Sequence, residues 1–142
     1  MAQAPQGRKK DLVEYALGEN VQLEVYWRND KAGYGPAASV YAHGQEVLRL
    51  DCFGEAKKHG GKGHCHINLK QTKVRQWMYP PATVKDHIEH AMSDLRQNLN
   101  YCLKTNTDEK IQQTNVDPEV LAPIVEQTKE KMMGFMKQLE LG

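Results

Sequence analysis

The spacing of apolar residues changes once along this chain, and this change constrains the fold more than any other feature. Residues 20–70 alternate apolar and polar side chains in short runs separated by glycine, whereas residues 83–140 repeat apolar side chains every three or four positions. Alternation is typical of strands with one buried face, and the longer period is typical of amphipathic helices. The order predicts an α+β fold, with an antiparallel sheet of four or more strands and two long helices packed on one face.

Both helices have recognisable starting residues. Thr83, with Asp86 three positions later, matches a capping box, and it predicts a helix over about 84–103. Asp117 followed by Pro118 is a typical helix start and predicts a second helix over about 118–140.

The length of 142 residues fits one domain. We expect a flexible, basic tail over 1–10 and a single domain over 11–142, with the sheet over about 20–70. Residues 11–17 fit either a strand or a short helix, and the pattern does not decide between them. We find neither an export signal in the first residues nor an apolar run long enough to cross a membrane, so we expect a cytoplasmic protein.

Strand candidates cover residues 21–28, 37–42, 46–53 and 64–69. Glycine, aspartate and proline over 29–36 predict a loop, and His43-Gly44 fits a tight hairpin turn that needs positive φ. Because side chains alternate across a strand, Val47 and Asn68 are predicted on the polar face. The same alternation gathers the polar and titratable side chains on one open face opposite the helices: Glu24, Tyr26, Arg49, Asp51, His64 and His66.

One use of this face is phosphodiester cleavage in RNA without a metal ion. Such a reaction needs a base for the 2′-hydroxyl, an acid for the leaving oxygen and cations for the developing charge. Glu24 or one of the two histidines, His64 and His66, would be the base. The other histidine would be the acid, and Arg49 would stabilise the charge.

The neighbouring loop strengthens this reading. Residues 54–75 carry six basic side chains and one acidic, so Lys57, Lys58 and Lys62 could contact phosphates. Tyr26 could stack on a base.

The alternative use is metal binding. His64 and His66 point the same way from a strand, and Asp51 could complete a site for iron, or His59 a site for zinc. In the RNA reading no cofactor is needed. A third reading is a non-catalytic module that docks a protein partner, or a second copy of the chain, through its last helix.

Other reactive or aromatic residues favour structural roles. Cys52, Cys65 and Cys102 fall on apolar faces and are predicted to be reduced core residues. His87 and His90 lie off the apolar stripe of the first helix and are predicted at the surface. The segment 77–79 is predicted to pack between sheet and helix.

Several short motifs resemble small bacterial toxins of the TumE type. They are Val25-Tyr26-Trp27, Leu48-Arg49-Leu50-Asp51, Gly63-His64-Cys65-His66-Ile67 and a helix that opens with a threonine cap. The likeness covers about a third of the chain and does not extend to the helix that begins at Asp117. It implies a protein that acts on RNA, is paired with an antitoxin, and uses Arg49, Asp51, His64 and His66. A domain of unknown function with the same layout is the alternative.

Overall fold

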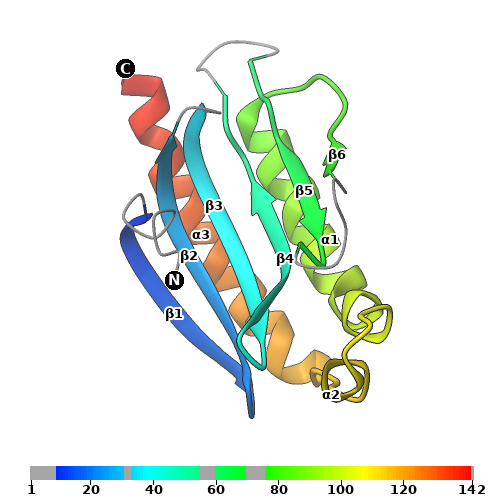
Figure 1. The fold of residues 1–142 in the computed structure, drawn as a ribbon. Coiled ribbons are helices and arrows are strands. Elements are labelled where there is room, and N and C mark those ends of the chain that lie inside the picture. The colour runs from blue at the N-terminus through cyan, green and yellow to red at the C-terminus, as the bar shows by residue number, and fades with distance from the viewer. Residues whose placement is uncertain (1–8, 31–32, 55–59, 70–75, 142) are drawn as a thin grey trace.

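An antiparallel meander occupies the first half of the chain. The computed structural model describes residues 9–30, 33–54, 60–69 and 76–141. Within these residues six strands lie side by side in sequence order (Figure 1). They are β1 (Lys9–Gly18), β2 (Val21–Asp30), β3 (Gly33–Ala42), β4 (Gln45–Asp51), β5 (His64–Ile67) and β6 (Gln76–Met78).

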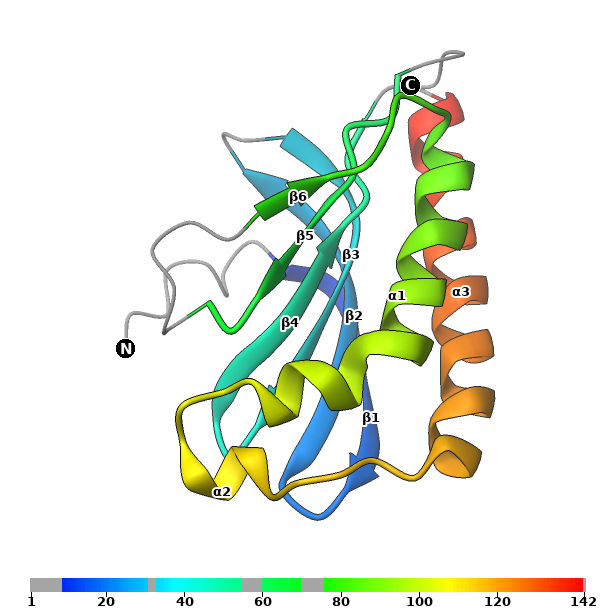
Figure 2. The same cartoon turned by 90° about the vertical axis from the view of Figure 1, so that its right-hand side faces the viewer.

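Two long helices cover one face of this sheet. They are α1 (Val84–Lys104) and α3 (Pro118–Leu141), and the short α2 (Glu109–Gln112) lies between them in sequence. Figure 2 shows α1 and α3 packed together on the same side of the strands. Thr83 Oγ1 accepts a hydrogen bond from the Asp86 N–H at 3.0 Å, as the capping box predicts. The α+β prediction and both long helices are confirmed.

The core fills the space between the sheet and these helices. Its buried apolar side chains include Val25, Leu48, Leu50, Ile88, Leu95, Leu99, Leu121, Val125, Met132 and Phe135. The last four belong to α3 and are buried against the rest of the chain. A docking or dimer face on this helix would have to use its other side chains, and it stays a prediction. The cysteines are free and buried, as predicted.

The first strands are longer than the sequence pattern indicated. Residues 11–17 belong to strand β1, which also includes Lys9 and Lys10, two residues that we had placed in the tail. The predicted loop over 29–36 is wrong, because β2 and β3 remain paired as far as Asp30 and Gly33. Pro36 lacks an N–H, but its carbonyl still accepts from the Cys52 N–H at 2.9 Å, so the ladder continues through it.

The turn between β3 and β4 matches the prediction. His43 and Gly44 have φ values of 48° and 81°. Positive φ at both central positions is typical of the two-residue turn that fits the twist of a hairpin.

Two side chains lie on a different face from the one predicted. A register shift between Val40 and Tyr41 lets both Val47 and Leu48 enter the core, so Val47 leaves the polar face. Asn68 follows the end of β5 with a φ of 47°, and its amide donates to the Cys102 carbonyl at 3.1 Å. The simple alternation therefore fails at a bulge and at a strand end.

The segment before α1 also differs from the prediction. Tyr79 is buried, but Trp77 and Met78 in the edge strand β6 are exposed rather than packed between sheet and helix. Their strand is short and lies at the end of the sheet, where the described residues provide little cover.

Candidate functional site

Strand register brings the central predicted residues together. Asp51 lies opposite His64, and Arg49 lies opposite His66 in the β4–β5 pair. All four side chains point away from the helices, because Leu50 and Cys65 between them enter the core. The sheet therefore holds a group of titratable side chains at neighbouring positions, which we call the Asp51 cluster (Arg28, Arg49, Asp51, His64 and His66).

The Asp51 carboxylate is the centre of this cluster, with an exposed fraction of only 1%. Its Oδ1 lies 3.3 Å from Arg28 Nη1, and its Oδ2 lies 3.1 Å from Arg49 Nε. The Nε2 atoms of His64 and His66 lie 3.1 and 3.5 Å from the same Oδ2.

These contacts decide the ionisation of Asp51. Burial by itself would raise the pKa of this carboxyl group. The hydrogen bonds with His64 and His66 and the charges of Arg49 and Arg28 more than offset that effect, so the pKa of Asp51 lies well below its ordinary value. Asp51 is a fixed negative charge that orients its neighbours, and it is a poor general base.

The two histidines have different surroundings. His64 Nδ1 lies 3.2 Å from the Lys62 carbonyl oxygen, while its Nε2 faces Asp51. Both neighbours are acceptors, so His64 makes both hydrogen bonds only when each ring nitrogen carries a proton. His66 faces Asp51 through Nε2, and among the described residues no partner contacts its Nδ1. The His66 side chain is 17% exposed, and its ring centroid lies 5.0 Å from that of His64.

Arg28 is a site residue that we did not predict. It follows Glu24 and Tyr26 at the same alternation, so the strand pattern placed it on the correct face. In the structure β2 continues to Asp30, so Arg28 lies inside the strand and beside Asp51. Our predicted loop over 29–36 had ended the strand at residue 28.

A buried histidine on α1 supports the start of β5. His87 Nδ1 accepts a hydrogen bond from the Gly63 N–H at 2.9 Å, and Nε2 lies 2.8 Å from the Pro80 carbonyl oxygen. Our surface prediction for His87 is wrong, because the Gly63 backbone passes close to α1 and buries the ring. Since Gly63 precedes His64, this contact fixes the backbone that presents the cluster.

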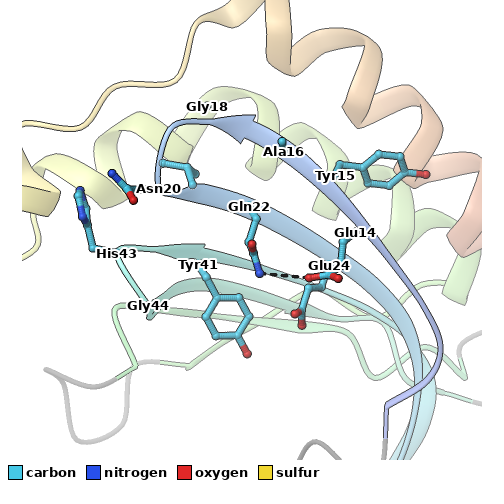
Figure 3. Close-up of a pocket in the computed structure, with 11 residues that line it drawn as sticks. Glu14, Tyr15, Ala16, Gly18, Asn20, Gln22, Glu24, Tyr41, His43 and Gly44 are labelled. Carbon is cyan, nitrogen blue, oxygen red and sulfur yellow. Dashed lines mark hydrogen bonds between the residues drawn. The ribbon is translucent and has the colours of Figure 1, made fainter.

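Glu24 does not join the Asp51 cluster. Its carboxylate pairs with Lys9 Nζ at 2.8 Å. It lies with Glu14, Gln22 and Tyr41 in a separate hollow near the β3–β4 turn (Figure 3). Glu24 and His66 are three strands apart, so their backbones are separated by roughly 14 Å at about 4.8 Å per strand. Glu24 and the histidines therefore do not face one small ligand.

Tyr26 is also closed off. Its ring is 1% exposed, and its hydroxyl lies 2.7 Å from Ser39 Oγ, which donates to Glu46. Glu46 in turn lies 3.5 Å from Arg49. Tyr26 therefore has no free face on which a base could stack, and it instead supports the residues around Arg49.

The structure describes only part of the basic loop. Lys62 is exposed just before β5. Lys57, Lys58 and His59 lie outside the described residues, and with them the contacts that we predicted for these side chains.

The chemistry of the Asp51 cluster favours an anion over a cation. One ligand atom each from Asp51, His64 and His66 lie within 4.8 Å of one another, close enough to hold a metal ion. However, two guanidinium groups already contact the carboxylate, and Glu46 offsets only part of the Arg49 charge. A divalent cation would add charge of the same sign as both arginines, whereas a phosphate would complement them.

A family model matches most of the chain. The model is that of a domain of unknown function (DUF7700), and it covers residues 16–132. The chain belongs to this family. No curated protein and no solved structure matches the chain. Within the described residues of this DUF7700 protein, no helix is long and apolar enough to cross a membrane.

Proposed function

We propose that the Asp51 cluster binds a phosphate group of RNA and cleaves the adjacent phosphodiester bond without a metal ion. One observation carries this proposal. A single buried carboxylate holds two imidazoles together while two guanidinium groups neutralise it. The result is a set of proton-transferring groups beside fixed positive charges, which is what the reaction requires.

The two histidines take complementary roles. His66 is the base and removes the proton of the 2′-hydroxyl. Its Nδ1 can accept that proton, because among the described residues no hydrogen-bond partner contacts this atom. The 2′-oxygen forms a bond to phosphorus as the bond to the 5′-oxygen breaks. His64 is the acid: with both ring nitrogens protonated, it gives the Nε2 proton that faces Asp51 to the leaving oxygen, while Nδ1 stays on the Lys62 carbonyl. Arg28 and Arg49 stabilise the charge on the phosphoryl oxygens.

The resemblance to TumE-type toxins fits this proposal through Arg49, Asp51, His64 and His66. A role of that kind would place the protein in the cytoplasm, with an antitoxin as its protein partner. Lys62 then guides the RNA backbone toward β5, while Glu24 and Tyr26 have no direct role in the reaction.

A cleavage assay in the presence of EDTA tests the proposal. The parent protein should cleave a single-stranded RNA and leave the 2′-deoxy version of the same strand intact. His66→Asn should reduce kcat by a factor of about 100 or more, whereas His90→Asn on the exposed face of α1 should retain full activity. Equal RNA cleavage by His66→Asn and the parent would refute the proposal.

Metal binding is the second candidate function, because three ligand atoms converge within 4.8 Å. The hydrogen bond between His64 Nδ1 and the Lys62 carbonyl is also typical of a metal-binding histidine. Metal analysis of purified protein separates the candidates. Zinc or iron at one equivalent in the parent, and its loss in His64→Ala, would favour a metal centre over the proposed phosphate site.

A further inference from the structure

A hollow lies between β5, β6 and α1, on the face of the sheet opposite the Asp51 cluster. It has a volume of about 370 Å³. Cys65, Ile67 and Trp77 line it from the strands, and His90, Asp94 and Tyr101 line it from one face of α1. Its volume lies within the range of roughly 300–1,000 Å³ that is usual for small-molecule sites.

Two aromatic side chains at this hollow are unusually exposed. Trp77 is 44% exposed and Tyr101 is 65% exposed, whereas Trp27, the other tryptophan, is buried in the core. Large apolar side chains that gather in the open often mark a binding surface. The π-faces of tryptophan and tyrosine also carry partial negative charge and attract cations.

Asp94 gives the hollow its charge. It is the one aspartate, glutamate, lysine or arginine among the described residues that line it. Tyr79 donates its hydroxyl proton to Asp94 Oδ2 at 3.0 Å, and the Asn98 amide donates to Oδ1 at 3.3 Å. The carboxylate is therefore held in place next to the aromatic walls, with no lysine or arginine beside it in the lining. His90 Nε2 lies 3.8 Å from Asp94 Oδ2 at the edge of the same hollow.

We propose that this hollow binds a small organic cation, such as a molecule that carries a trimethylammonium group. Asp94 supplies the opposite charge, and Trp77 and Tyr101 supply aromatic faces for the methyl groups of the ammonium head. A neutral ligand would gain nothing from Asp94, and an anion would be repelled by it. This inference does not depend on RNA cleavage, because the two sites lie on opposite faces of the sheet.

The neighbouring thiol takes no covalent part. Burial raises the pKa of Cys65 to about 11, so this side chain stays protonated at neutral pH and forms an apolar wall.

Titration with choline, monitored by the indole N–H signals in NMR spectra, tests the proposal. The chain has two tryptophans, so Trp77→Phe assigns both signals. Choline should shift the Trp77 signal saturably, with a Kd of about 1 mM, and leave the Trp27 signal unmoved. The neutral carbon isostere, dimethylbutanol, should bind about tenfold more weakly.

Variants of α1 sharpen this test. Asp94→Asn keeps an acceptor for Tyr79 and should weaken choline binding about tenfold, whereas Glu89→Gln removes an exposed carboxylate outside the hollow and should bind as the parent does. Equal shifts with choline and its isostere, or no shift with either, would overturn the proposal. A Trp77 signal that responds to protein concentration and not to choline would also overturn it, and would indicate contact between copies of the chain.

Discussion

At the scale of single residues, Asp51 determines the character of the site. Its carboxylate is buried, yet two arginines and two histidines keep it ionised. Removing one partner from a buried group of charges leaves the remaining charges uncompensated. The resulting loss of folding stability is far larger than the loss from breaking an ion pair at the surface. Asp51 is therefore a residue on which both stability and the proposed chemistry depend.

Asp51→Asn should lower the free energy of unfolding at pH 7 by about 3 kcal/mol, because Arg28 and Arg49 lose their shared counter-charge. The pKa of Asp51 in the folded chain lies below its ordinary value of 3.8. Its stabilising contribution is thus complete above about pH 4 and is lost as the pH falls further toward the folded pKa. Urea unfolding at several pH values should show a shallower loss of stability in acid for Asp51→Asn than for the parent.

The exposed Glu126 on α3 provides the control for charge loss alone. In Glu126→Gln the free energy of unfolding should fall with decreasing pH as steeply as it does in the parent. An Asp51→Asn curve parallel to that of the parent would mean that the buried carboxylate does not act as described.

At the scale of elements, the contact between α1 and β5 fixes the position of the histidines. The Gly63 backbone packs so closely on α1 that an added Cβ would lie 2.7 Å from His87 Nδ1 and 2.8 Å from Tyr79 Cδ2. Glycine is required here by this close approach, and His87 uses the resulting space to bond the backbone.

Gly63→Ala should destabilise the protein by about 2 kcal/mol through overpacking. His87→Ala should destabilise it by a similar amount, about 2 kcal/mol, because the Gly63 N–H and the Pro80 carbonyl lose their partner. In the double variant the clash with His87 Nδ1 is gone, while the contacts with Tyr79 Cδ2 and the Cβ of residue 87 remain. The combined loss should therefore be smaller than the sum by about 1 kcal/mol. Strictly additive free energies from chemical denaturation would show that the two residues do not interact.

The sequence predicted regular elements well and irregular ones poorly. Apolar periodicity and the Thr83 cap located α1 to within a residue, because both signals are local. The bulge beside Val47, the buried position of Asn68 and the continued pairing through Pro36 depend on neighbouring strands, which a local sequence pattern does not include.

The grouping of Asp51, His64 and His66 could be predicted from the sequence, because the antiparallel pairing of β4 with β5 places these positions next to one another. Glu24 was placed beside the histidines because it lies on the same face of the sheet. Sharing a face does not specify how many strands separate two residues, and Glu24 lies three strands away from His66.

At the scale of the whole molecule, α3 is part of the core rather than an appendage. Leu121, Val125, Met132 and Phe135 are all buried against the rest of the chain. Losing one such side chain typically costs about 2–5 kcal/mol, while the total stability of a domain is roughly 5–15 kcal/mol.

Deletion of residues 117–142 should therefore prevent folding. Circular dichroism should show no cooperative thermal transition for the shortened chain. Val120→Ser, which changes an exposed apolar residue on the same helix, should keep a transition near that of the parent. A cooperative transition in the deleted chain would show that the sheet and α1 form a stable core by themselves.

The measurement that tests the central claim most directly is the pH dependence of kcat/KM for RNA cleavage with EDTA present. We expect a bell-shaped curve for the parent, because His66 must be neutral and His64 protonated for the reaction to proceed. His66→Ala should abolish the rising limb, and His64→Ala the falling one. Cleavage that is absent from the parent, or that follows the same curve after both substitutions, would contradict the account.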